Sequence, residues 1–198
     1  GLVDEARTEA RRLVATFKPY VDRDVPIIGL EPSCLFTLRD ELQAMLPGDD
    51  SRKLGEQALL FEEFLDREMD AGHLKLPLHA LPAQRLWLHG HCHQKAFNVM
   101  GPVQRVLGRI PGSDVRLIPS SCCGMAGAFG YQAETYAISM AMAESALLPK
   151  VRQAGDGEWI VADGTSCRHQ IADGAGRAAL HVARVLAAAL DKDQPGGA

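Results

Sequence analysis

Four short apolar runs in this chain each end in a glycine, serine or proline turn that leads directly to a cysteine. They lie at residues 27–34, 86–92, 115–123 and 159–167. Their length and their boundaries are typical of buried parallel strands. Most are followed by a segment with the apolar spacing of a helix. The pattern predicts an α/β fold, in which repeated strand–helix units form a helix-flanked, mostly parallel sheet.

This arrangement places every cysteine at the carboxyl end of a strand. Ligands of open α/β sheets collect just beyond the carboxyl ends of the strands. Thiols that are far apart in the sequence are therefore expected to converge in space, and this convergence is the main indication of function.

The apolar spacing predicts helices and strands along the whole chain, with residues 72–83, which hold two prolines, two histidines and a glycine, as a linker. Residues 191–198 are polar and glycine-rich and are expected to form a frayed end. The predicted helices begin and end near residues 3–17, 35–45, 53–69, 92–107, 132–151 and 180–190, and the strands near 27–30, 85–89, 115–118 and 159–162. Gly101-Pro102 is expected to kink or split the fourth helix.

Composition excludes two broad classes of protein. The chain has 198 residues and a formal charge of −4, with 21 basic and 25 acidic side chains that are mostly interleaved, so no basic stripe is present to bind nucleic acid. No apolar stretch approaches the roughly 18 to 20 residues that a membrane helix needs, which argues against an integral membrane protein. No signal sequence opens the chain, which begins abruptly in a helical pattern. We expect a cytoplasmic protein and a piece of a longer one.

The five cysteines are expected to be free thiols. An odd number does not favour a disulfide framework. Cys122 and Cys123 are neighbours, and their Cα atoms, about 3.8 Å apart, are too close for an unstrained disulfide. A reducing cytoplasm fits this pattern.

Three uses of such thiols compete. They could be small buried hydrophobic residues, but two adjacent cysteines at a strand end are more than a core requires. They could be redox or nucleophilic thiols, but no Cys-x-x-Cys pair is present. They could hold a metal, since several soft thiolates select zinc, copper(I) or an iron–sulfur cluster.

Spacing favours an iron–sulfur cluster, with zinc as the runner-up. Structural zinc sites generally use short Cys-x2–4-Cys knuckles. Here 29 residues separate Cys92 from Cys122, and 43 separate Cys123 from Cys167. Ligands from separate strand ends fit a polynuclear group better than a single ion.

Residues beside the cysteines are candidates for contact with the cofactor. Gly124 opens a run of small residues that lets the backbone approach a bulky ligand. His91, His93 and His169 flank cysteines, either as outer hydrogen-bond donors or as plain surface side chains, and we do not assign them as ligands.

Three motifs resemble a known family. They are His-Gly-His-Cys-His-Gln-Lys-Ala at 89–96, Ser-Cys-Cys-Gly-Met-Ala-Gly-Ala-Phe-Gly-Tyr at 121–131 and Gly-Thr-Ser-Cys-Arg-His-Gln-Ile at 164–171. Together they resemble the cysteine-rich CCG domain, found in the B subunit of heterodisulfide reductase and the iron–sulfur subunit of glycolate oxidase. The similarity is strongest to the C-terminal part of FAD-linked oxidases with an iron–sulfur region, of the D-lactate or D-2-hydroxyglutarate dehydrogenase kind.

The resemblance implies a set of ligands. A complete CCG module would span 84–190 and use Cys92, Cys122, Cys123 and Cys167. Residues 1–71 would be the remainder of a first module, truncated at its N-terminus, with Cys34 as its late cysteine. Many members end a module with Cys-x-x-Cys, but Gln170 stands at that place here. A four-thiolate [4Fe-4S] cluster is therefore expected rather than a five-thiolate one, and Cys34 either is orphaned or approaches the same site.

The resemblance also implies a function. The chain would be the C-terminal iron–sulfur electron-transfer domain of an FAD-linked 2-hydroxyacid dehydrogenase, relaying electrons from flavin to an unknown acceptor. The FAD domain and a ferredoxin-like domain would lie elsewhere in the parent chain, and this piece alone would be inactive. The alternative is a structural zinc-binding module for interaction or assembly.

Overall fold

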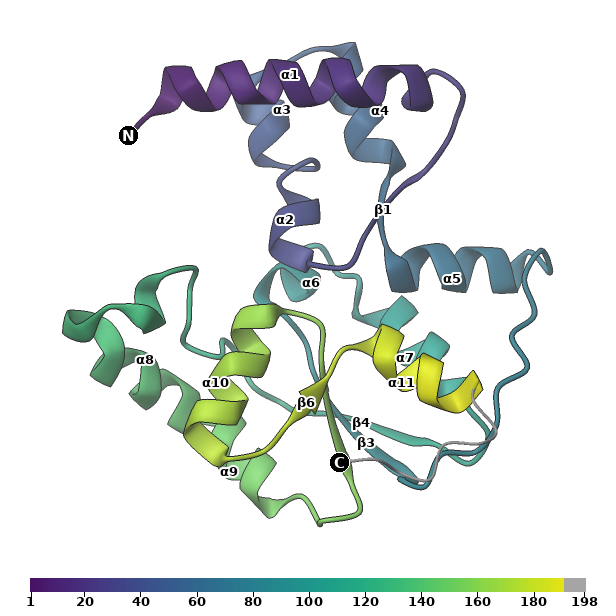
Figure 1. Ribbon diagram of the computed structural model, residues 1–198, viewed down its shortest axis with the longest axis vertical. Helices are drawn as coiled ribbons and strands as arrows, with labels where there is room; N and C mark the ends of the chain where they lie inside the picture. The colour runs from purple at the N-terminus through teal and green to yellow at the C-terminus, as the bar shows by residue number, and fades with distance from the viewer. Residues whose placement is uncertain (191–198) are drawn as a thin grey trace. The chain divides into compact units, whose positions relative to one another are not determined.

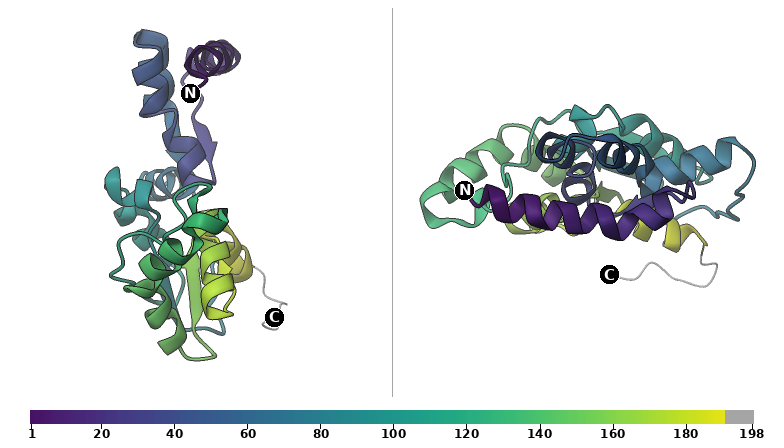
Figure 2. Two further views of the ribbon diagram at one scale, coloured as in Figure 1. Left: turned by 90° about the vertical axis from the view of Figure 1, so that its left-hand side faces the viewer. Right: turned by 90° about the horizontal axis from the view of Figure 1, so that it is seen from above.

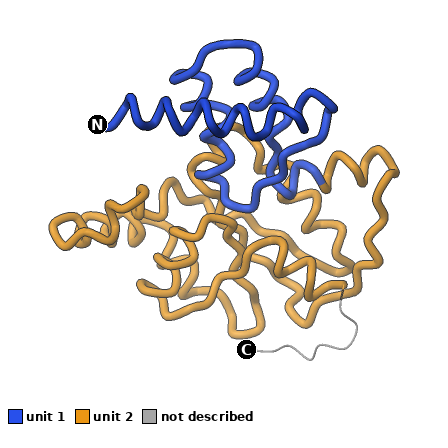
Figure 3. The backbone as a smooth tube through the Cα atoms, turned by 45° about the horizontal axis from the view of Figure 1, so that its top comes forward, with its two compact units in different colours: residues 1–64 blue, residues 65–198 orange. Residues whose placement is uncertain are grey.

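A computed structural model describes residues 1–190, which form two compact units, residues 1–64 and 65–190 (Figure 3). The division falls inside the helix α5 (Phe61–Asp70). The boundary between the two predicted modules, at 72–83, stays a prediction. The predicted frayed tail, 191–198, lies outside the described residues.

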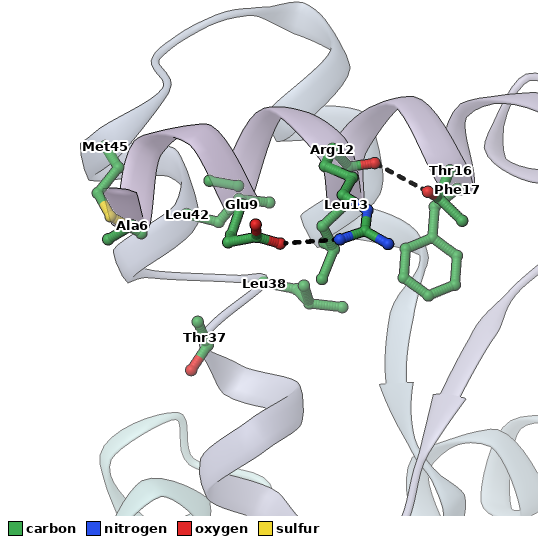
Figure 4. A pocket seen from close by; sticks show the side chains of 11 residues that line it. Ala6, Glu9, Arg12, Leu13, Thr16, Phe17, Thr37, Leu38, Leu42 and Met45 are labelled. Carbon is green, nitrogen blue, oxygen red and sulfur yellow. Dashed lines mark hydrogen bonds and ion pairs between the residues drawn. The ribbon is translucent and has the colours of Figure 1, made fainter. Parts of the chain in front are cut away.

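The first unit combines four helices with a pair of short strands. Its elements are, in chain order, α1 (Val3–Val21), β1 (Ile27–Gly29), α2 (Pro32–Phe36), α3 (Glu41–Met45), α4 (Asp49–Gln57) and β2 (Ala58–Leu60), followed by the start of α5. α1 packs across α3 and α4 (Figure 1; Figure 2). Only Ala10 and Val21 of α1 are buried. An apolar pocket of about 390 Å³ lies between α1 and residues 37–45 (Figure 4).

The strand β2 corrects the helix predicted over 53–69. Ala58–Leu60 pairs in parallel with β1, with Ile28 opposite Leu59. The Arg39 guanidinium donates to the Ala58 carbonyl at 2.7 Å, and the Leu60 amide donates to the Glu63 carboxylate at 2.9 Å. These bonds occupy backbone groups that a continuous helix would use internally, so the segment is extended. The helix predicted at 35–45 is also split, into α2 and α3.

The second unit is built on a four-stranded parallel sheet. Beyond α5 its elements are β3 (Arg85–His89), α6 (Cys92–Ala96), α7 (Met100–Gly108), β4 (Asp114–Leu117), the 3-10 turn η1 (Phe129–Tyr131), α8 (Ala133–Glu144), α9 (Leu147–Gln153), β5 (Trp159–Ala162), α10 (Thr165–Ala175), β6 (Ala179–Leu180) and α11 (Val182–Leu190). The strand order is β4-β3-β5-β6. The predicted α/β fold, with helix-flanked parallel strands, is confirmed.

Two groups of helices flank this sheet (Figure 1). α8, α9 and α10 pack on one another, and α7 packs against α11. One buried cluster joins the sheet to the first group and includes Ile118, Ile160, Leu147, Val151 and Ile171. Two of the predicted metal ligands, Cys123 and Cys167, belong to the same cluster.

The strand order creates a switch point between β3 and β5. The chain leaves β3 for β4 on one side, and returns from β4 to β5 on the other side of β3. At such a point the connections diverge and leave a crevice beyond the carboxyl ends of the strands. His89, the last residue of β3, lies opposite Ala162, the last residue of β5.

Two predicted helices are broken, each for a local reason. The helix predicted at 132–151 divides between Glu144 and Leu147, because Pro149 lacks the amide that would bond to Ser145 and its ring would clash with that carbonyl. The helix predicted at 92–107 does split, but ahead of Gly101-Pro102, at Asn98, where φ is +55°. Pro102 lies in the first turn of α7, where a missing amide costs nothing.

Within residues 1–190 we find no helix long and apolar enough to cross a membrane. The predicted cytoplasmic location is not tested by this observation.

Candidate metal centre

Three neighbouring strand ends deliver four cysteines to the carboxyl edge of the sheet in the second unit. Cys92 is the first residue of α6, after β3, and Cys167 lies in the first turn of α10, after β5. Cys122 and Cys123 follow β4. All are free thiols; Cys123 and Cys167 are buried, whereas Cys92 and Cys122 are partly exposed.

The four sulfurs form a connected row. The sulfurs are close enough to shift one another's pKa, Cys92 with Cys122, Cys122 with Cys123, and Cys123 with Cys167. Those of Cys123 and Cys167 lie within 4.8 Å of each other. The Gly124 amide donates to the Cys122 sulfur at 3.3 Å. The structure thus brings together the four cysteines of the predicted complete module. Their role as ligands stays a prediction.

Hydrogen bonding divides these thiols into two kinds. The Cys123 thiol, together with that of Cys92, lowers the pKa of Cys122, and the Cys123 thiol also lowers the pKa of Cys167. The same bonds, together with burial, raise the pKa of Cys92 and of Cys123. The pKa values of neighbouring thiols are therefore shifted in opposite directions along the row. A bound cation would favour loss of the remaining protons, because it stabilises all four thiolates.

A buried hydrogen-bond network fixes α6 against β5. His91 caps α6, since its Nδ1 accepts from the His93 amide at 3.2 Å and its own amide donates to Gln94 Oε1 at 2.9 Å. Gln94 Nε2 donates to the Asp163 carboxylate at 2.7 Å, and this carboxylate also accepts from the Val182 amide at 3.1 Å. The network holds Cys92 in place relative to the strand that leads to Cys167.

Close backbone packing surrounds the cysteine pair. Gly124 has a φ of +93°, and an added Cβ there would lie 2.2 Å from the Ser139 carbonyl oxygen of α8. The Gln170 side chain donates to the same carbonyl at 3.2 Å. At Gly164 a Cβ would lie 2.4 Å from the His91 ring and 3.2 Å from the Cys167 sulfur. Only glycine allows these approaches.

Two cations near the site bind backbone carbonyls. Lys95 Nζ donates to the carbonyls of Ser120 and, at 2.7 Å, Ser121, which precede the cysteine pair. Arg168 donates at 3.1 Å to the Ala162 carbonyl at the end of β5. Burial lowers the pKa of Lys95, and the nearby thiolates oppose that shift.

The other candidates from the sequence occupy different surroundings. The His93 ring stacks on that of His91, with centroids 5.2 Å apart. His169 is exposed, and its Nδ1 lies 2.6 Å from the Tyr131 hydroxyl. Cys34 is exposed in α2, within the first unit, so its membership of the site stays a prediction.

Sequence reasoning missed His89. It is fully buried, and one of its ring nitrogens lies within 4.8 Å of the sulfurs of Cys123 and Cys167, which also lie within that distance of each other. After the Cys123 thiol, the His89 ring also lowers the pKa of Cys167. Its position at the end of β3 is the same signal that singled out the cysteines, and that signal could have found it.

The residues present fit a thiolate-bound metal group. Four soft sulfur donors converge, and the glycine-rich loop beside them is shaped by close contacts. These donors suit zinc or an iron–sulfur cluster and are poor ligands for the hard ions Mg²⁺ and Ca²⁺.

Curated relatives of the chain are dehydrogenases and a dehydrogenase subunit. One subunit of the anaerobic glycerol-3-phosphate dehydrogenase of Escherichia coli (strain K12) is 30% identical over 96% of this chain and 47% of its own length. The D-2-hydroxyglutarate dehydrogenase of Haemophilus influenzae is 28% identical over 74% of this chain and 14% of its own length. The D-2-hydroxyglutarate dehydrogenase of Escherichia coli (strain K12) is 25% identical over 94% of this chain and 18% of its own length.

The chain therefore spans about half the length, or less, of these relatives. No family profile matches it, and no solved structure matches it. The resemblance stated from the motifs is confirmed, because the relatives include D-2-hydroxyglutarate dehydrogenases.

Proposed function

We propose that this chain, a homologue of dehydrogenase subunits, carries an iron–sulfur centre that passes electrons within a larger dehydrogenase. The observation that carries the proposal is the row of four linked sulfurs delivered by three strand ends. The dehydrogenase relatives support it, since they cover nearly the whole chain.

Cys92, Cys122, Cys123 and Cys167 would hold the cluster, which when bound supplies one-electron transfer. The protein would bury one side of the cluster and leave the other side accessible to solvent. Cys123 and Cys167 are shielded from water, whereas Cys92 and Cys122 are partly exposed. An electron donor or acceptor can therefore approach closest from the side of Cys92 and Cys122.

Amide and lysine groups would balance the charge of the thiolates. The Gly124 amide donates to the Cys122 sulfur, and Lys95 holds its ammonium group beside the cysteine loop. Hydrogen bonds and positive charge near cluster sulfurs favour the reduced, more negative state.

For the whole protein, we propose an FAD domain and a ferredoxin-like domain elsewhere in the parent chain, and oxidation of a 2-hydroxyacid. The D-2-hydroxyglutarate dehydrogenases support this substrate class. The glycerol-3-phosphate dehydrogenase relative favours a second candidate, glycerol 3-phosphate. Reduction of a dye by the parent protein with each substrate in turn distinguishes the two, and this chain alone should oxidise neither.

Metal analysis tests the cluster itself. After anaerobic reconstitution, the chain should contain iron and acid-labile sulfide in near-equal amounts and absorb in the visible range. Cys122→Ser should lose most of the iron. Ser121→Ala is the matched control, since the Ser121 side chain is exposed and only its carbonyl is used.

Absence of sulfide, together with one tightly held zinc ion, would instead establish the zinc-binding alternative. The sulfurs and His89 also offer the mixed donor set of structural zinc sites. Unfolding of the second unit by a chelator would then identify the metal as structural.

A further inference from the structure

His89 is a fully buried imidazole at the cysteine row, and its contacts point to a metal. Its ring is fully buried at the end of β3. Nδ1 lies 2.8 Å from the Ser120 hydroxyl oxygen, but Nε2 makes no well-formed hydrogen bond within residues 1–190. A buried nitrogen in this position calls for an explanation, and a bound ion is one of the few available.

The surroundings of His89 supply that explanation. A ring nitrogen of His89 and the sulfurs of Cys123 and Cys167 all lie within 4.8 Å of one another. With metal–sulfur and metal–nitrogen bonds of about 2.3 and 2.0–2.1 Å, two sulfur ligands of one ion lie at most about 4.6 Å apart, and a sulfur and a nitrogen at most about 4.4 Å. The three atoms are therefore spaced almost as closely as ligands of one metal atom.

The bond to Ser120 suits a ligand role. Histidines that bind metals generally donate their other ring N–H to an oxygen, which fixes the tautomer and the orientation of the ring. With Nδ1–H donating to the Ser120 hydroxyl, the lone pair of Nε2 is free. Ser120 lies two residues before Cys122, so the same loop places both the sulfur ligands and the oxygen that orients the ring.

We propose that His89 Nε2 is a direct ligand of the metal centre, beside Cys123 and Cys167. The proposal rests on the proposed function only in that a metal group is held at this site. It makes the ligand set mixed, with a neutral nitrogen among the thiolates. Because imidazole carries no negative charge, a cluster with His89 as a ligand should have a higher reduction potential than one with a thiolate in that position.

Pulsed electron paramagnetic resonance on the reduced, reconstituted chain tests the ligand directly. With 15N-histidine incorporated, the wild type should show the strong hyperfine coupling of a directly bonded nitrogen. His89→Gln should lose this coupling. His169→Ala is the matched control and should keep it, since His169 also flanks a cysteine but pairs with Tyr131. His89→Cys should retain iron and lower the reduction potential.

The outcomes separate this proposal from the proposed function. Iron and sulfide with no strongly coupled nitrogen, or a coupling that survives in His89→Gln, would overturn the His89 assignment and leave the cluster intact. If the chain holds zinc without sulfide, the cluster proposal fails, and X-ray absorption decides on His89. A nitrogen neighbour at about 2.0 Å that disappears in His89→Gln supports the ligand, and an all-sulfur shell overturns it.

Discussion

Replacing Gly124 by alanine should destabilise the second unit more than the same change at Gly127, three residues further on. Both glycines have positive φ, +93° and +66°, which other residues adopt at a cost of about 1–3 kcal/mol. At Gly124 the added Cβ would also lie 2.2 Å from the Ser139 carbonyl oxygen, whereas at Gly127 nothing lies within 4 Å. Such overpacking costs about 1–3 kcal/mol more. We expect losses in the free energy of unfolding of about 2–6 kcal/mol for Gly124→Ala and about 1–3 kcal/mol for Gly127→Ala.

Urea unfolding followed by tryptophan fluorescence measures this difference in the right part of the chain. The chain has two tryptophans, Trp87 in β3 and Trp159 in β5, so the signal reports the sheet of the second unit. A reductant and a chelator are included, so that the measured free energy belongs to the polypeptide and not to a bound metal.

Equal losses for the two variants would refute the reasoning, because the backbone strain is shared and only the contact with Ser139 differs. If Gly124→Ala lowers the free energy of unfolding but leaves the metal content of reconstituted protein unchanged, the close approach of Gly124 to Ser139 serves packing alone. A loss of both stability and metal would show that the position of α8 also shapes the cysteine loop.

The same assay checks two further side chains. Asp163→Ala should lower the free energy of unfolding by about 2–6 kcal/mol, because the buried Gln94 side-chain amide and the Val182 backbone amide each lose an acceptor worth about 1–3 kcal/mol. Asp163→Asn keeps one acceptor oxygen and should lower it less. Equal losses for the two variants would contradict this account. The hydrogen bond from the Trp87 side chain, and after it the one from the Gly155 amide, lower the pKa of Glu158 below 4.5. The stability that the Glu158 carboxylate contributes is therefore complete above pH 4.5 and is lost as the pH falls through the lowered pKa. The urea midpoint of Glu158→Gln should therefore be below that of the wild type at pH 7 and approach it in acid; a gap that stays constant from pH 7 to pH 3 would exclude this linkage.

The amino-acid sequence alone determined the local framework of the site. The apolar runs before Cys92, Cys123 and Cys167 are long enough for strands, and glycine or serine ends each of them, so the strand–helix units and the cysteines at strand ends were predictable. The parallel sheet follows, because short connections through helices permit little else. Helix ends were less predictable, although Pro149 marks one of them.

Tertiary structure decided the features that depend on partners distant in the chain. Ala58–Leu60 has a helical pattern around it and becomes a strand only because β1 and the Arg39 side chain bond to its backbone. The order β4-β3-β5-β6 cannot be read from the spacing, since it depends on which edge of β3 each later strand joins. That order brings the sulfurs into one row and places the His89 ring beside them. Packing between segments far apart in the sequence, and not any local preference, creates the site.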